Sequence, residues 1–155
     1  VKYSDILKLP YNLKGFFEYE EALTYSKKNN KPMLLDFTGH GCVNCRDIES
    51  RVWPDDRVRD YLNNKYVLVS LYVDDKTQLP EKDWYTSNYD SKTKKTIGKQ
   101  NADFQITRFN NNAQPFYVVI DPFSEKIVYR PWGYELNVES YISHLENGVT
   151  KFYEE

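Results

Sequence analysis

Two short apolar runs predict buried β-strands in the first half of the chain. They occupy residues 33–37 (MLLDF) and 66–73 (YVLVSLYV), and polar or turn-forming residues flank both. The second run is rich in β-branched and aromatic side chains, which favour strands. The segment between them, residues 42–62, has helical periodicity with a break at Pro54. A strand, a helical crossover and a second buried strand form a βαβ unit, so we expect the two strands to be parallel neighbours.

The remaining apolar positions predict further helices and a hairpin. Spacing of three to four residues marks the helices. We therefore predict helices at residues 17–30, 42–52, 55–62, 96–109 and 138–152. The runs 116–120 (FYVVI) and 126–129 (KIVY) flank a turn-forming segment and predict a β-hairpin. This order of elements predicts an α/β fold, with a mixed central sheet of about four strands flanked by helices.

Two segments fall outside this alternation. Residues 1–14 have mixed polarity and are predicted to form an N-terminal lead-in arm to a domain at residues 15–155. Residues 74–95 are polar and turn-prone, and predict an insertion loop between the second strand and the following helix. The longest apolar run has eight residues, whereas about 18–20 are needed to span a bilayer, so we expect no direct membrane insertion by this chain. Its first residue is valine, which suggests a mature form or a piece of a longer protein.

Composition narrows the class of protein. The chain has 155 residues, a length typical of one domain, and 21 basic against 23 acidic side chains give a net charge of −2. This balance argues against a nucleic-acid partner, because such surfaces need clustered positive charge. The 14 Tyr, 8 Phe and 3 Trp can supply a hydrophobic core, so we expect a folded chain and not an intrinsically disordered one. Because no heptad pattern or large apolar stripe is present, we expect a monomer.

The only cysteines, Cys42 and Cys45, carry the candidate chemistry. Two cysteines exclude a disulfide-stapled mini-domain and a four-cysteine zinc site. A C-x-x-C pair directly after a buried strand and at the start of a helix favours a thioredoxin-like redox motif. The helix N-terminus stabilises a thiolate at Cys42, and Cys45 lies one turn further on, where it can resolve a mixed disulfide. Half a zinc site with His40, or an inert pair, is the alternative interpretation.

The residues around the pair resemble a known family. The stretch LLDFTGHGCVNCRDIE is similar to the thioredoxin superfamily, and most similar to the C-terminal periplasmic domains of DsbD-type thiol:disulfide interchange proteins. The likeness continues through YVLVSLYVDD and FQITRFNNNAQPFYVVID and covers nearly the whole chain after about residue 15. The resemblance implies a periplasmic reductase without metal or organic cofactor. Its implied partners are other thiol–disulfide proteins and a membrane-embedded cysteine pair of the same polypeptide.

The resemblance also implies roles for individual residues. Asp36 matches a buried carboxylate that takes and returns the proton of Cys45. Glu49 matches a second acidic position near the cysteines. Two nearby carboxylates oppose the helix dipole, so we expect a reducing pair rather than a strong oxidant. Pro115, after Gln114, matches the cis-proline that faces the cysteines and presents backbone to an extended substrate. The simpler alternatives are that Asp36 is an ordinary strand-end acid, that Glu49 is a solvated acid on a helix face, and that Pro115 is an edge-strand proline.

The chain departs from the thioredoxin pattern immediately before the first cysteine. Thioredoxins usually have tryptophan there, whereas this chain has Gly41, preceded by His40. We expect Gly41 and Val43 to border the substrate-binding face together with Gln114 and Pro115, with a rim that is less apolar than in thioredoxins. Three other functions remain open from the sequence. They are a free-standing periplasmic reductase, a non-catalytic interaction module with a structural disulfide, and a cytosolic thioredoxin.

Overall fold

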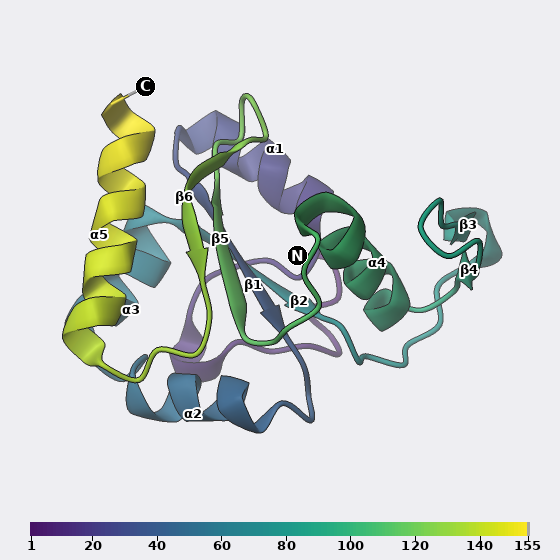
Figure 1. Ribbon diagram of the computed structural model, residues 1–155, viewed down its shortest axis with the longest axis horizontal. Helices are drawn as coiled ribbons and strands as arrows, with labels where there is room; N and C mark the ends of the chain where they lie inside the picture. The colour runs from purple at the N-terminus through teal and green to yellow at the C-terminus, as the bar shows by residue number, and fades with distance from the viewer. Residues whose placement is uncertain (155) are drawn as a thin grey trace.

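A four-stranded mixed sheet forms the centre of the protein (Figure 1). The structure is a computed structural model that describes residues 1–154. The strands are β1 (Met33–Thr38), β2 (Val67–Tyr72), β5 (Phe116–Ile120) and β6 (Ile127–Trp132), in the order β2-β1-β5-β6. β1 runs parallel to β2 and antiparallel to β5, and β6 returns antiparallel to β5. The predicted α/β fold with a mixed sheet of about four strands is therefore confirmed.

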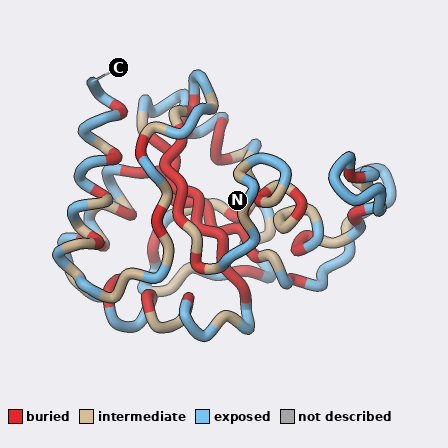
Figure 2. Tube along the Cα trace, in the orientation of Figure 1, coloured by how far each residue is buried: buried red, intermediate tan, exposed pale blue. Residues whose placement is uncertain are grey.

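Helices cover both faces of the sheet. Figure 1 shows α1 (Tyr19–Asn29) and α4 (Ile97–Phe109) on one side, and α3 (Asp56–Asp60) and α5 (Val138–Glu154) on the other. α2 (Val43–Arg51) packs with α3 and α5, because its Ile48 shares their apolar cluster. Every residue of β1 and β2 is buried, which Figure 2 shows as a red centre.

Strand alternation divides the core into two layers and places one acid beneath α2. Leu34 belongs to the apolar cluster of α2, α3 and α5, whereas Leu35 and Phe37 belong to that of α1 and α4. Because successive side chains of a strand point to opposite faces, Asp36 shares the face of Leu34. The apolar run that predicted β1 therefore carries a carboxyl group into the core, where it is only 2% exposed.

Side-chain caps set several helix boundaries close to the predicted ones. The carboxylate of Glu18 accepts hydrogen bonds from the backbone N–H groups of Glu20 and Glu21 and begins α1. Asp55 caps α3 and Thr96 caps α4 in the same way. After α3 the chain continues as a short π-helical turn, η2 (Tyr61–Lys65), into β2.

The insertion is more ordered than the predicted loop. It contains a 3₁₀ turn, η3 (Glu81–Asp83), and a two-stranded antiparallel sheet of β3 (Tyr85–Thr86) and β4 (Thr93–Lys94), which projects from the body (Figure 1). The Tyr85 hydroxyl donates to Asp103 on α4 over 2.9 Å and attaches the hairpin to the domain. The sequence did not indicate these two strands, because strands of two residues have no detectable alternation.

The N-terminal arm, together with Phe16 just after it, lies along the β2 edge of the sheet. It contains a 3₁₀ turn, η1 (Pro10–Asn12), and its Leu7 and Leu13 are 3% and 7% exposed. The Phe16 N–H donates to the Leu68 carbonyl over 2.8 Å, and the Ser70 N–H donates to the Phe16 carbonyl over 2.9 Å. These bonds satisfy part of the outer edge of β2, which blunts edge-to-edge association. None of the helices in residues 1–154 is long and apolar enough to cross a membrane.

Candidate redox site

The two cysteines lie at the N-terminus of α2 and form a disulfide bond. Cys42 is the N-cap residue, and its Sγ accepts the backbone N–H of Cys45 over 3.2 Å. Cys45 is 1% exposed, whereas Cys42 is half-buried. An attacking thiolate therefore reaches Cys42 Sγ more easily than Cys45 Sγ. This difference in access agrees with the order of roles expected from the sequence.

Asp36 is buried on the sheet face that α2 covers. The Ser70 hydroxyl of the neighbouring strand donates to its Oδ2 over 2.9 Å. Burial and the nearby negative charge of Glu49 raise the pKa of Asp36 from 3.8 to about 7, and the Ser70 hydrogen bond and Arg46 offset this only in part. A carboxyl group with a pKa near neutrality can both accept and return a proton, as general acid–base catalysis requires.

Arg46 connects Glu49 to the end of β1. Its Nη2 donates to Glu49 Oε2 over 2.8 Å and to Thr38 Oγ1 over 2.9 Å. The side chain of Glu49 is 15% exposed, and this burial raises its pKa although Arg46 opposes the shift. The structure thus brings Glu49 within electrostatic range of Asp36. Sequence reasoning did not identify Arg46, although its position three residues before Glu49 on one helix is a signal for such a pair.

A second pair of acids holds the loop before Cys42. Asp74 accepts the N–H of His40 on Oδ1 over 2.7 Å and the N–H of Gly41 on Oδ2 over 2.9 Å. Partial burial alone would raise the pKa of Asp74, but these two hydrogen bonds, together with the His40 charge and the N–H of Asp74 itself, outweigh it and the pKa is lowered. The His40 ring pairs with Asp75 over 2.8 Å and stacks on Tyr72.

The two hydrogen bonds from this loop to Asp74 were not predicted, although the sequence contains one signal for them. Asp74 and Asp75 follow β2, and the active-site loop follows β1. Because parallel neighbouring strands end at the same edge of the sheet, polar residues after each strand meet there. Both acids lie at the start of the segment that was predicted to form the insertion.

Asp74→Asn should lower the free energy of unfolding by about 1–2 kcal/mol, because an amide has a single acceptor oxygen and leaves one backbone N–H of the loop without its partner. Urea denaturation at pH 7 measures this change. Asp5→Asn is the matched control, since Asp5 is exposed and its side chain makes no hydrogen bond within the described residues. Equal denaturation midpoints for the two variants would contradict a stabilising role for the hydrogen bonds between Asp74 and the loop.

The four residues expected at the substrate face lie in two places. Gly41 and Val43 flank Cys42 on the surface, and Val43 is 72% exposed. The Gln114–Pro115 peptide bond is cis, and Pro115 is buried. Phe116 pairs with Phe37, so Pro115 lies at the end of the sheet where β1 leads into the active-site loop.

The side chain of Gln114 is engaged within the protein. Its Nε2 donates to Gln105 Oε1 over 2.9 Å and to the Asn112 carbonyl over 3.2 Å. For metal binding, residues 1–154 contain no group of three or more His, Cys, Asp or Glu side chains that could hold an ion.

Fold and site together define the class of thiol–disulfide oxidoreductases: a disulfide-bonded C-x-x-C pair caps the first helix after a central strand of a thioredoxin-like fold. The profile of the thioredoxin-like family matches residues 14–122. The chain belongs to that family. No curated protein sequence matches it significantly.

Solved structures share the fold at low sequence identity. A DsbH oxidoreductase has a TM-score of 0.65 and 20% identity over 93% of this chain and 91% of its own. A thioredoxin from Thermus thermophilus has a TM-score of 0.63 and 19% identity over 89% of this chain and 88% of its own. The reduced C-terminal domain of DsbD from Neisseria meningitidis has a TM-score of 0.57 and 13% identity over 86% of this chain and 98% of its own. At these identities the likeness establishes the fold alone.

Proposed function

We propose that this protein is a periplasmic protein-disulfide reductase that acts as the electron-relay domain of a DsbD-type membrane reductase. One observation carries the proposal. An accessible Cys42 and a buried Cys45 share a disulfide at the start of α2, and Asp36, with a pKa of about 7, is buried beneath that helix. The fold shared with a DsbD C-terminal domain supports the assignment to this type. The electrons reside on the cysteine pair, and no metal or organic cofactor takes part.

The reduced protein acts in two exchanges. The Cys42 thiolate attacks one sulfur of the substrate disulfide, which forms a mixed disulfide and releases the first substrate sulfur as a thiolate. The Cys45 thiol then transfers its proton to the Asp36 carboxylate and attacks Cys42 Sγ, which releases the second substrate sulfur as a thiolate. The substrate gains two electrons, its two thiolates take two protons from water, and the protein is left with the Cys42–Cys45 disulfide and a protonated Asp36.

Recharging is the reverse exchange. A donor thiolate attacks Cys42 Sγ, and Cys45 leaves as a thiolate that takes its proton from the protonated Asp36. A membrane-embedded cysteine pair of the same polypeptide is the proposed donor. Glu49 acts indirectly, because its charge raises the pKa of Asp36 and opposes the positive N-terminal end of α2. Gly41, Val43 and the backbone at Gln114 and Pro115 form the proposed docking face for the partner.

Cys45→Ser should trap a covalent adduct, because the serine cannot resolve the mixed disulfide on Cys42. The reduced variant is incubated with insulin, and the adduct is detected on a non-reducing gel and released by dithiothreitol. The Cys42→Ser/Cys45→Ser double variant is the control and should form none. Absence of an adduct with the single variant would favour a non-catalytic interaction module.

The DsbD-type role is tested by the electron donor. The oxidised protein is mixed with a purified DsbD membrane domain that has been reduced beforehand, and its thiols are quantified by alkylation. We expect rapid reduction by that domain and slow reduction by thioredoxin reductase with NADPH. The opposite preference would identify a thioredoxin of the cytosolic type and contradict the relay role.

A further inference from the structure

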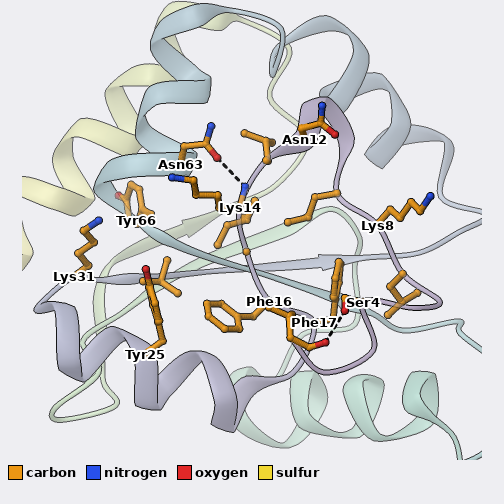
Figure 3. Close-up of a pocket in the computed structure, with 17 residues that line it drawn as sticks. Ser4, Lys8, Asn12, Lys14, Phe16, Phe17, Tyr25, Lys31, Asn63 and Tyr66 are labelled. Carbon is orange, nitrogen blue, oxygen red and sulfur yellow. Dashed lines mark hydrogen bonds between the residues drawn. The ribbon is translucent and has the colours of Figure 1, made fainter.

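A cavity of about 620 Å³ lies beneath the N-terminal arm (Figure 3). The arm, α1 and the start of β2 form its walls, and neither cysteine nor Asp36 lines it. Its volume falls within the range of about 300–1,000 Å³ typical of small-molecule sites. Much of its lining is apolar, including Leu7, Leu9, Leu13, Phe16 and Leu68.

The charged residues of this groove are all positive. Lys8, Lys14 and Lys31 line it, and no aspartate or glutamate does. This asymmetry is notable in a chain with 23 acidic residues and a net charge of −2. Among the described residues, none of the three lysines forms a salt bridge. The groove therefore combines an apolar surface with unneutralised positive charge, which is complementary to an amphipathic anion.

Two of the lysines gather near one end. The Lys14 N–H donates to Asn63 Oδ1 over 2.8 Å, which places Lys14 beside the segment before β2. The Val67 N–H donates to the Pro32 carbonyl over 2.9 Å, which places Lys31 beside the start of that strand. In Figure 3 both side chains lie toward the Asn63 and Tyr66 end, with Lys8 toward the opposite end.

We propose that this groove binds a monomeric long-chain carboxylate. The carboxylate lies between Lys14 and Lys31, where the Tyr25 hydroxyl also lines the groove, and the hydrocarbon chain lies along Phe16 and the leucines of the arm. Two lysines close to one end and apolar surface along the body fit an acyl chain with a single head group better than a peptide, whose backbone needs hydrogen-bond partners at every residue.

The probe is dodecanoate, titrated by calorimetry below the concentration at which it forms micelles. We expect binding to weaken about fourfold for each methylene removed, as decanoate and octanoate would show, because each buried methylene contributes similarly. Lys14→Glu/Lys31→Glu should weaken binding at least about tenfold, because two favourable charge contacts become repulsive. Lys28→Glu/Lys126→Glu is the matched control, since both lysines are exposed and outside the groove. Its affinity should equal that of the unmodified protein.

Three results would overturn the proposal. They are equal binding of dodecyltrimethylammonium, equal binding by the two double variants, and binding to phosphatidylglycerol vesicles without binding to monomeric dodecanoate. Insulin reduction by the Lys14→Glu/Lys31→Glu variant should be unchanged, because neither lysine belongs to the redox site. This assay separates failure of the carboxylate site from failure of the proposed reductase function.

Discussion

Replacing Cys42 by serine should reduce insulin reduction by this protein to the background rate of the dithiol in the assay. The reacting species in disulfide exchange is a thiolate, and a serine hydroxyl neither ionises near pH 7 nor forms a disulfide. Cys45 cannot substitute for Cys42, because it is only 1% exposed and an approaching disulfide cannot reach its Sγ. The assay follows insulin precipitation with dithiothreitol as the electron source.

Two further variants make this result specific to Cys42. Cys45→Ser should form the initial adduct but should lose multiple turnover. Phe123→Ala should stay close to the unmodified rate, since Phe123 is exposed in the turn between β5 and β6 and belongs to neither the cysteine pair nor the proposed docking face. Circular dichroism of all three variants should match the unmodified protein. Activity of Cys42→Ser above background would mean that Cys45 is the attacking residue.

Asp36→Asn should raise the free energy of unfolding of the oxidised protein by about 4 kcal/mol at pH 8 and leave it nearly unchanged at pH 3.5. The pKa of Asp36 is raised from 3.8 to about 7 in the folded protein. Each pKa unit corresponds to about 1.36 kcal/mol, which converts the difference between these values into this order of magnitude. Asparagine has a similar shape but carries no charge that must be buried.

The direction in which stability changes with pH follows from the protons bound by the folded and unfolded states. Between pH 3.8 and about 7 the folded protein holds a proton on Asp36 that the unfolded chain has released. The unfolded state therefore binds fewer protons, and stability falls as the pH rises through this range. The favourable contribution of protonated Asp36 is complete below pH 3.8 and is lost as the pH passes about 7. Urea denaturation of both proteins from pH 3.5 to 8 measures the change, with Asp5→Asn as control. A pH-independent difference would contradict the raised pKa.

The same substitution should slow catalysis, because Cys45 loses the group that takes its proton. With Asp36 present, the step in which Cys45 resolves the mixed disulfide should accelerate as the pH rises through about 7. In Asp36→Asn that dependence should disappear. The hydrogen bond from Ser70 to Asp36 Oδ2 lowers the pKa of Asp36. Ser70→Ala removes this bond, so it should raise that pKa and move the rise in rate to higher pH. If Asp36→Asn raises the free energy of unfolding and also slows disulfide exchange, Asp36 is buried for its function and not for stability.

The amino-acid sequence determined the elements that depend on local pattern. Apolar runs predicted the buried strands, and the helix caps lie at or next to the predicted boundaries. The C-x-x-C pair could be placed correctly because its meaning depends on neighbouring residues, a strand before it and a helix after it. The role of Asp36 came instead from resemblance to a family, since one acid in an apolar strand does not reveal which helix will cover it.

Tertiary structure alone decided the electrostatics of the site and the shape of the groove. Asp74 lies 34 residues from His40, and Asn63 lies 49 residues from Lys14, so their hydrogen bonds exist only after the sheet has formed. The pKa of Asp36 depends on burial beneath α2 and on the distance to Glu49, and neither follows from the order of residues. Local pattern specifies elements because it acts between near neighbours. Solvent exclusion and charge proximity act between segments that folding brings together.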